Sequence, residues 1–370
     1  MGGLGLMFRR RAIQAHPTIS EGGYILSAEK GDAEVLRILM ANGVSSDGVG
    51  ITKEDAAAVT SLHTWFYGSS IKNFDELAYF TGLVSLGSTN CFRNCYSLVS
   101  LKLPESTKKI PTACFNGCSS LISVGDTTFV EEIGSEAFKS TAISIVDYPN
   151  LKRIDGSGVW TGSQVEEVIS LGKITDLPSE SNWANGAFRD CQKLKRVNLP
   201  SSLLELKEHT FYNCNNLEYV NLEHIRYIRG NVFYNCTNWA QEVVLPNIME
   251  LGYATFKQSG ISSVDFTGSP LSVISGQNDW AEGMFYSCTN MQKAILGENL
   301  QEIQPLAFAN CVKLNAIVCL AVSPPTMKDT NVFSSTNNCP IYVPGASVES
   351  YKASWSTYAS RIIALSEYQG

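Results

Sequence analysis

The sequence predicts a β-rich solenoid, in which the chain winds into a coil of short stacked turns. One phrase recurs at a step of 22 or 23 residues: an aromatic residue, then cysteine three positions later and leucine six positions later, as at Phe92, Cys95 and Leu98. A fixed period of about 20 to 50 residues is the signature of a repeat architecture. The aromatic anchors of ten repeats are Phe92, Phe115, Phe138, Trp160, Phe188, Phe211, Phe233, Phe256, Phe285 and Phe308, and Phe333 is read as a degenerate eleventh.

The composition suits an ordered chain with a substantial core. Of the 370 residues, 44% are hydrophobic and 10% are aromatic, which is too apolar for a disordered chain. The formal net charge is −7. Binding to phosphate backbones needs clustered Lys and Arg, so no nucleic-acid partner is expected. The chain has no apolar run of about 18 residues, so no transmembrane segment is expected.

Each repeat holds two short strand-like segments. In residues 194–199, apolar and polar side chains alternate, which is typical of a strand with one buried face, and Pro200 ends it. A second apolar phrase, such as residues 202–206, follows and leads to the next anchor. One turn of the coil is therefore expected to have two strand-like sides. Neighbouring turns pair in parallel at a spacing of about 4.8 Å.

Two steps between anchors are longer than the rest, 28 residues from Trp160 to Phe188 and 29 residues from Phe256 to Phe285. Trp183 and Trp280 each lie five residues before the anchor that follows. Anchors four repeats apart differ by 95 to 97 residues throughout, which indicates duplication of a four-repeat block. The two insertions are therefore expected to leave the coil at corresponding places.

The ends of a solenoid need caps, because they expose apolar edges. Residues 1–80 lack the repeat and are predicted to form an N-terminal arm and a helical cap, with helical pieces at 32–41, after Thr52 and at 74–80. Residues 81–320 form the solenoid. Residues 321–370 are predicted to form a C-terminal cap with a final strand and a short helix, because Pro324-Pro325 breaks the rhythm of the repeats.

The eleven cysteines are best explained as buried, reduced thiols. Seven of them take the third position after an anchor: Cys95, Cys118, Cys191, Cys214, Cys236, Cys288 and Cys311. The repeats anchored at Phe138, Trp160 and Phe256 lack this cysteine, and in each the next apolar residue comes one position early. Since the two changes go together, the thiol is interpreted as a small filler of one bend. A zinc site would use convergent pairs, so no metal is expected.

The residues that carry this pattern resemble the BspA-type, or Treponema pallidum-type, bacterial leucine-rich repeat, whose phrase runs A-F-x-x-C-x-x-L-x-x-I-x-L-P. The match covers about residues 81–320, and the closing segment around Tyr342, Tyr351 and Trp355 is similar to the C-terminal cap of such proteins from gut Bacteroides. The resemblance implies a leucine-rich-repeat solenoid with a parallel sheet. It also implies a surface or secreted protein that adheres to host matrix or to other bacteria.

The sequence carries no arrangement typical of catalysis. The four histidines, His16, His63, His209 and His224, are scattered, and no metalloprotease, nucleophile-elbow, phosphate-loop or dinucleotide pattern appears. His209 and His224 are expected to be solvated. Buried thiols are poor nucleophiles, because burial in apolar surroundings raises their pKa. We therefore expect neither an enzyme nor a cofactor.

An extended binding surface is expected instead. If the central Val or Leu of each first strand points inward, its flanking residues point outward, as do the pairs Arg196/Asn198 and Tyr219/Asn221 and, farther along, Lys293 and the pair Ala316/Val318. Arg and Tyr are enriched among the residues that dominate protein–protein binding. Trp183 and Trp280, in the insertions, are rival candidates: they either stack on a sugar ring or pin their loops to the body, and their equal offset favours pinning.

Two classes of function follow. The first is a non-catalytic recognition or adhesion module for a protein or glycan partner at a bacterial surface. The alternative is a structural or host-attachment component of a phage or mobile element. An enzyme ranks third. The location stays open between the cell surface, a phage virion and the cytoplasm, because the apolar stretch precedes Arg9-Arg10-Arg11, the reverse of the order in a secretory signal.

Overall fold

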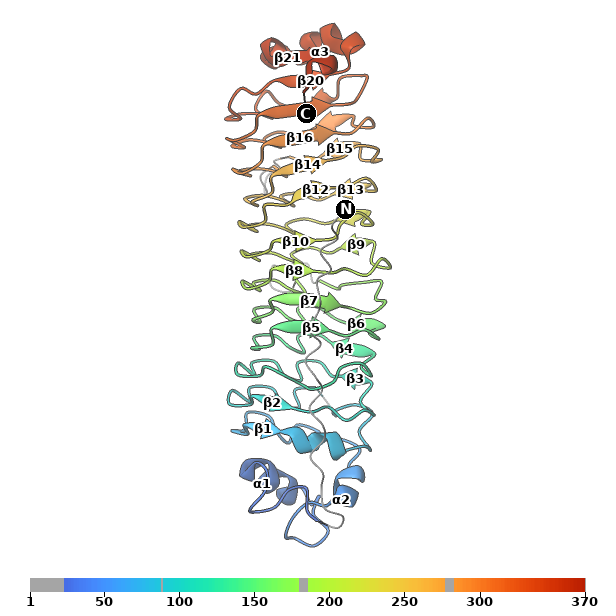
Figure 1. The fold of residues 1–370 in the computed structure, drawn as a ribbon, viewed down its shortest axis with the longest axis vertical. Coiled ribbons are helices and arrows are strands. Elements are labelled where there is room, and N and C mark those ends of the chain that lie inside the picture. Colours follow the sequence, from blue (N-terminus) through green and yellow to red (C-terminus); the bar gives the residue numbers. More distant parts are fainter. Residues whose placement is uncertain (1–22, 88, 180–185, 277–282, 370) are drawn as a thin grey trace, which may run out of the picture.

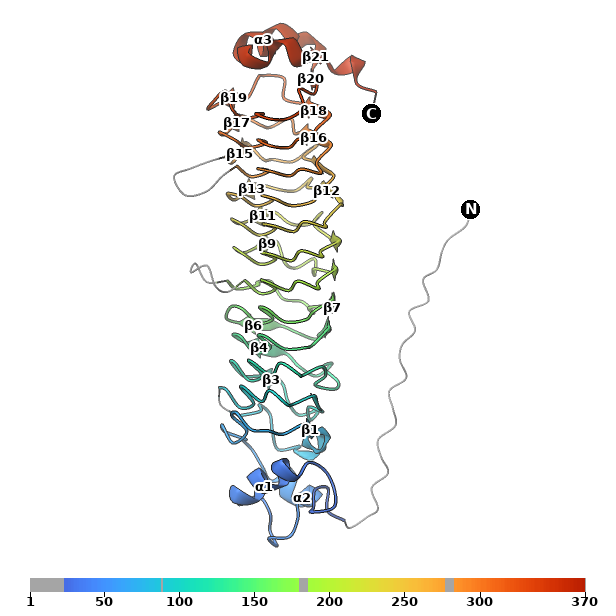
Figure 2. The same ribbon diagram turned by 90° about the vertical axis from the view of Figure 1, so that its left-hand side faces the viewer.

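The chain forms a long, narrow rod in which one turn lies on the next (Figure 1). The computed structural model describes residues 23–87, 89–179, 186–276 and 283–369. The predicted solenoid is confirmed: the rod is a parallel-sheet coil of about 12 turns with little helix. Figure 2 shows that the strands form two columns on opposite sides of the rod. We call these the first and the second strand column.

The first strand column follows the cysteine phrase of each repeat. Its strands are β1 (Asn73–Phe74), β2 (Ser100–Leu101), β5 (Ile145–Asp147), β7 (Glu167–Ser170), β8 (Arg196–Val197), β10 (Tyr219–Val220), β12 (Glu242–Val244), β14 (Ser263–Asp265), β16 (Lys293–Leu296), β18 (Ala316–Cys319), β20 (Ile341–Val343) and β21 (Ile362–Ala364). All their pairings are parallel, and the buried Val197 of β8 pairs with the buried Val220 of β10. The inward central residue expected from the alternation is confirmed here.

The second strand column comes from the shorter apolar phrase of each repeat. Its strands are β3 (Lys109–Ile110), β4 (Glu132–Gly134), β6 (Arg153–Asp155), β9 (Glu205–Leu206), β11 (Tyr227–Ile228), β13 (Glu250–Leu251), β15 (Val273–Ile274), β17 (Glu302–Ile303) and β19 (Thr326–Met327). Hydrogen-bonded pairing is interrupted between β6 and β9 and between β13 and β15. The first interruption spans the long step from Trp160 to Phe188, and the second includes the beginning of the long step from Phe256 to Phe285.

The anchors form one continuous column of rings through the core. Ring centroids of neighbouring anchors lie between 4.9 and 6.4 Å apart, and most pairs are close to parallel. The long steps do not break the column, since Trp160 lies 4.9 Å from Phe188 and Phe256 lies 5.4 Å from Phe285. The column is longer than the ten repeats of the sequence pattern. Phe66 stacks on Phe92 at one end, and Phe333 packs on Phe308 at the other.

The cysteines are free and buried, as expected, and they also link neighbouring turns. The thiol at the third position donates a hydrogen bond to the carbonyl oxygen of the anchor on the preceding turn, from Cys95 to Phe66 at 2.8 Å and from Cys214 to Phe188 at 3.2 Å. The other five thiols of the phrase do the same. Where Thr141 replaces cysteine, its hydroxyl bonds to its own anchor, Phe138, instead.

A sharp corner follows each anchor. The sequence pattern did not predict the backbone conformation that this corner needs. The residue two positions after the anchor has a positive φ, for example 61° at Asn94 and 60° at Asn213. L residues with a Cβ rarely adopt this region, and Asn, Asp and Gly tolerate it best. The residues at this corner are Asn94, Gly117, Ser140, Gly162, Asp190, Asn213, Asn235, Gln258, Ser287 and Asn310.

The helices expected near the N-terminus are present. Helix α1 (Ala33–Ala41) begins after Asp32, whose carboxylate accepts a hydrogen bond from the Glu34 amide. Helix α2 (Lys53–Ala57) begins with a capping box between Thr52 and Asp55. The third piece is a 3-10 helix, η1 (Asp75–Tyr79). Phe66 and β1 already belong to the stacked turns, ahead of residue 81, and the N-terminal arm to residue 22 lies outside the described residues.

The C-terminal end closes with short helices around β20 and β21: η2 (Gly345–Ser347), α3 (Val348–Ser354), η3 (Ser356–Arg361) and η4 (Leu365–Glu367). The Tyr358 ring packs edge-on against Phe333, the last ring of the column. The Trp355 indole donates a hydrogen bond to the Pro325 carbonyl at 2.8 Å. These contacts cover the end of the core. The division into an N-terminal part, a solenoid and a C-terminal cap stays a prediction.

Candidate interaction surface

Arg196 and Tyr219 lie side by side on the first strand column. They are register partners in β8 and β10, and the guanidinium carbon lies 4.9 Å from the centroid of the tyrosine ring. Arg196 is exposed and Tyr219 is half-buried. A guanidinium over an aromatic face is held in place electrostatically, so the pair presents a preformed polar and aromatic surface.

The two asparagines beside this pair differ in their roles. Asn198 is exposed. The Asn221 amide accepts a hydrogen bond from the Leu199 amide at 2.7 Å and donates one to the Leu199 carbonyl at 3.0 Å. Asn221 therefore clamps the end of β8 to the next turn. Asn198 has the more accessible side chain.

Lys293 does not join this group. It lies in β16, and β12 and β14 separate it from β10 along the column. Its ammonium lies 3.5 Å from the Glu242 carboxylate in β12. The order of the turns in the sequence already separates Lys293 from Arg196. What the sequence does not show is that the lysine side chain reaches Glu242 across two turns.

The insertion tryptophans, Trp183 and Trp280, lie outside the described residues, and their roles stay predictions. The residues at which the chain rejoins the coil are described. A Cβ on Gly186 would come within 1.9 Å of the His209 carbonyl oxygen, and one on Gly283 within 2.0 Å of the Leu306 carbonyl oxygen. Both glycines lie two residues before an anchor. The two long steps therefore end at equivalent points of tight backbone contact.

A row of exposed aliphatic side chains continues the surface toward the N-terminal end. Ile122, Ile145 and Ile169 are 59%, 52% and 43% exposed on successive turns before β8. A shallow groove is lined by Ile122, Ile145 and Asp147, among others, and partial burial raises the pKa of the Asp147 carboxyl. For Ile145 and Ile169 the signal was present in the sequence, because the alternation directs both positions outward.

The prediction that Ala316 and Val318 point outward, near the C-terminal end of the column, was wrong. Ala316 and Val318 are 7% and 2% exposed. Their strand, β18, lies between β16 and β20, and beside it the Tyr351 hydroxyl donates a hydrogen bond to the Ala321 carbonyl at 2.6 Å. The segment that holds β20 and Tyr351 packs beside this part of the column, so the open surface ends before β18.

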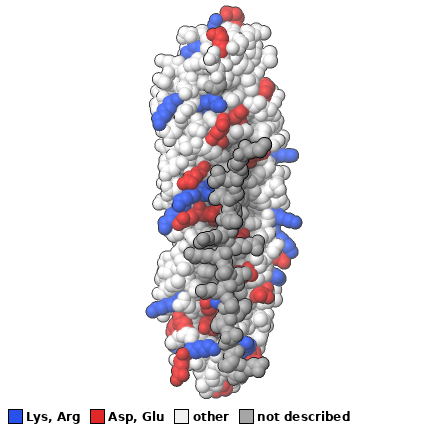
Figure 3. All heavy atoms as spheres, in the orientation of Figure 1, with Lys and Arg blue, Asp and Glu red and all other residues white. Residues whose placement is uncertain are grey.

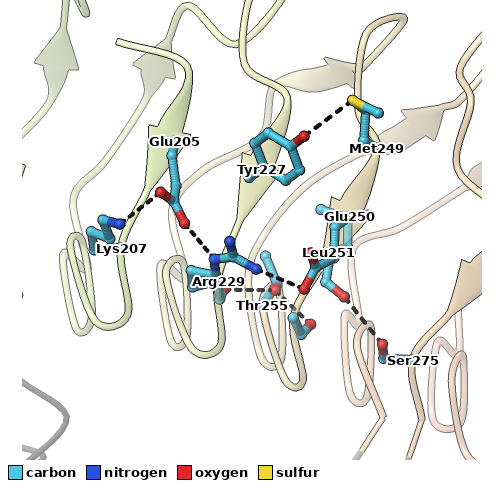
Figure 4. A network of polar contacts seen from close by, with 10 residues as sticks. Glu205, Lys207, Tyr227, Arg229, Met249, Glu250, Leu251, Thr255 and Ser275 are labelled. Carbon is cyan, nitrogen blue, oxygen red and sulfur yellow. Dashed lines mark hydrogen bonds and ion pairs between the residues drawn. The ribbon is translucent and has the colours of Figure 1, made fainter. Parts of the chain in front are cut away.

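The second strand column carries charged side chains that pair with one another. Figure 4 shows Arg229 between Glu205 and Glu250 of the neighbouring turns, with Lys207 on the far side of Glu205. Burial alone would raise the pKa of Glu205, but hydrogen bonds from Lys207 and Arg229 outweigh it and lower that pKa. These groups neutralise one another across turns. Their charges therefore stabilise the coil and are less available to a binding partner.

Charges of both signs are interspersed on the face seen in Figure 3, and neither forms a continuous stripe there. Among the described residues, no three His, Cys, Asp or Glu side chains gather as a metal site. No described helix is long and apolar enough to cross a bilayer. The absence of a nucleic-acid partner stays a prediction.

The solvated position expected for His209 was wrong. Its side chain is 2% exposed, and burial, with the nearby Arg189 charge, lowers its pKa to about 4. Its ring packs against Tyr212 at 5.5 Å. This histidine is therefore a neutral, packed side chain within the coil.

The two columns of short parallel strands and the recurring leucine phrase define a leucine-rich-repeat solenoid. A family model for the BspA type leucine rich repeat region matches residues 60–166, 168–278 and 270–340, so the chain belongs to this family. Solenoids of this family are generally non-enzymatic binding scaffolds, and leucine-rich-repeat proteins bind proteins.

Solved structures of bacterial repeat proteins resemble the chain. A leucine-rich repeat protein from Bacteroides ovatus is 19% identical, with a TM-score of 0.52 over 77% of this chain and 82% of the other. The Treponema pallidum leucine-rich repeat protein is 29% identical, with a TM-score of 0.36 over 42% of this chain and 72% of the other. A search of curated proteins found no relative of this chain.

Proposed function

We propose that the chain is a non-catalytic recognition module that binds a protein partner with the first strand column, centred on Arg196 and Tyr219. The observation that carries this proposal is the preformed pair itself, with the guanidinium 4.9 Å from the ring centroid. Arg and Tyr are enriched at the centres of protein interfaces, where rigid side chains lose little entropy on binding.

The neighbouring isoleucines support a protein partner. Ile145 and Ile169 are exposed on β5 and β7, directly before β8 in the sheet. Apolar side chains next to an Arg–Tyr pair provide a core that a partner can desolvate. The second strand column offers mainly charges that are already paired. The first column is therefore the better binding face.

The test uses an array of purified host matrix proteins and bacterial surface proteins. The wild-type chain is compared with the double variant Arg196→Ala/Tyr219→Ala. The matched control is Arg226→Ala/Tyr227→Ala, which removes an arginine and a tyrosine from the second column. We expect the first variant alone to lose capture by tenfold or more, with a melting temperature that falls by no more than a few degrees. Equal capture by both variants would contradict the proposed face.

Adhesion at a bacterial surface is our proposed setting, since the family typically serves surface binding or adhesion. The attachment component of a phage or mobile element stays the alternative. Neighbouring genes distinguish the two: tail and capsid genes support the alternative, and surface-lipoprotein genes support adhesion.

A further inference from the structure

A strip of tyrosines and cations runs along the corner of the rod, away from both strand columns. It consists of Arg189, Tyr212, Tyr234, Lys257 and Tyr286, the residues that directly follow five consecutive anchors. The Arg189 guanidinium lies 4.5 Å from the Tyr212 ring centroid, and Tyr212 and Tyr234 are stacked at 4.7 Å with 6° between their planes. The Lys257 ammonium lies 5.1 Å from the Tyr234 ring and 5.8 Å from the Tyr286 ring.

The stacking decides which parts of these tyrosines a ligand can reach. The ring faces of Tyr212 and Tyr234 are covered by each other and by the two cations, so they are closed to a stacking ligand. The three tyrosine side chains are half-buried. Among the described residues, the hydroxyls of Tyr212, Tyr234 and Tyr286 make no hydrogen bond to the protein. The strip therefore offers ring edges and hydroxyl groups.

Rows of amides accompany the strip on the same corners. The Asn213 amide donates a hydrogen bond to Asp190 at 2.9 Å, and the Asn235 amide donates one to Asn213 at 3.0 Å. In a second row, the Asn238 amide donates one to Asn216 at 2.9 Å. Each amide has two donor hydrogens and two acceptor lone pairs, so these bonds leave capacity for a ligand.

The strip differs from the Arg196–Tyr219 face in that no large exposed aliphatic side chain among the described residues lies beside it. On these turns the large exposed aliphatic side chains, Leu204, Val244 and Met249, lie on the strand columns and not beside the strip. Arg189 is already 3.1 Å from the Asp190 carboxylate. Apart from the two cations, which lie against the tyrosine rings, the strip presents a line of hydroxyls and amides, which suits a ligand that itself carries many hydroxyls.

We propose that this strip binds an uncharged linear polysaccharide lying along the rod, recognised by hydrogen bonds from tyrosine hydroxyls and asparagine amides. The site is separate from the Arg196–Tyr219 face, so the chain would hold a glycan on one side and a protein on another. The proposal does not depend on the protein-binding function.

The test is affinity electrophoresis of the full chain in gels that contain xylan, mannan, laminarin or dextran, and in gels that contain polygalacturonate. The decisive variant is Tyr212→Phe/Tyr234→Phe/Tyr286→Phe, which removes the hydroxyls and keeps the stacked rings. The matched control is Tyr67→Phe/Tyr96→Phe, which removes two exposed hydroxyls outside the strip.

We expect retardation by at least one neutral polysaccharide, little change on raising the salt concentration, and at least a tenfold loss of affinity in the triple variant only. Three lost hydrogen bonds are sufficient for a loss of that order. No retardation in any gel, retardation by polygalacturonate alone, or equal retardation of the wild type and the triple variant would overturn the proposal. Protein capture by the triple variant should be unchanged, which separates this result from a failure of the protein-binding face.

Discussion

The Arg196 guanidinium packs over the Tyr219 ring of the next turn, 4.9 Å from its centroid. Because the pair bridges two turns, it should contribute to stability as well as to recognition. We expect a double-mutant cycle with Arg196→Gln and Tyr219→Leu to give a coupling of about 0.5 to 1 kcal/mol, measured by urea unfolding. If the two substitutions change the free energy of unfolding additively, the guanidinium and the tyrosine ring do not interact in solution.

Gly186 ends the first long step at a point of backbone contact. A Cβ there would lie 1.9 Å from the His209 carbonyl oxygen, and that backbone has to shift to admit it. Gly186→Ala should therefore destabilise the protein by about 2 kcal/mol or more, seen as a lower melting temperature.

The equivalent change at Gly283 should have a similar cost, since its Cβ would lie 2.0 Å from the Leu306 carbonyl oxygen. Gly345→Ala is the control, because the nearest atom to its Cβ would be 4.0 Å away. Unequal effects at Gly186 and Gly283 would argue against equivalent insertion sites.

The cysteines should resist reagents in the folded protein. All eleven are buried and free, and burial raises the pKa of Cys191 to about 12. We expect iodoacetamide to modify almost none of them in the native chain. After unfolding without a reductant it should modify all eleven, as counted by mass spectrometry. A shortfall of two or more in the unfolded sample would show disulfides.

The same thiols should make the fold sensitive to alkali. Burial raises the pKa of most of them in the folded state, Cys191, Cys214 and Cys236 among them, above the ordinary value of about 8.5. Their contribution to stability is therefore complete below about pH 8.5 and is lost progressively as the pH rises toward 12. The melting temperature should fall between pH 8.5 and 10. The variant Cys191→Ser should show a smaller fall than the wild type, and an identical fall would exclude this thiol as a contributor.

His209 should make the fold sensitive to acid. Its pKa is lowered to about 4 in the folded state by burial and by Arg189, against about 6.5 in the unfolded chain. Its contribution is complete above about pH 6.5 and is lost as the pH falls toward 4. We expect His209→Gln to reduce the difference in melting temperature between pH 7.5 and 5. The exposed His63→Asn serves as the control and should leave that difference unchanged.

The sequence was sufficient to predict the coil, because residues of the same chemical type recur at the same positions of each turn. The anchor, the thiol and the alternating strand each repeat, so the period survives local exceptions. Phe66 escaped the pattern because its step to Phe92 is 26 residues and Ser69 stands where cysteine is expected. Its place in the column depends on ring stacking across that irregular step, which no local rule encodes.

The surface was harder to predict than the core. Arg196 and Tyr219 were correctly placed together, because register follows from the repeat. The burial of Val318 depends on how the C-terminal cap folds back, and the burial of His209 depends on the packing of neighbouring turns. The strip at Tyr212 and Tyr234 does not follow from the strand alternation, because these residues lie at the corner directly after each anchor and not on a strand.

The two long steps have a consequence for how such a chain can diversify. Trp160 still stacks on Phe188, and Phe256 on Phe285, although five or six extra residues separate each pair. The stacking of the core rings is therefore independent of the length of the segment that joins them. Residues ahead of Gly186 and Gly283 can be added, lost or replaced at little thermodynamic cost, so one inherited scaffold can acquire new specificities through its insertions alone.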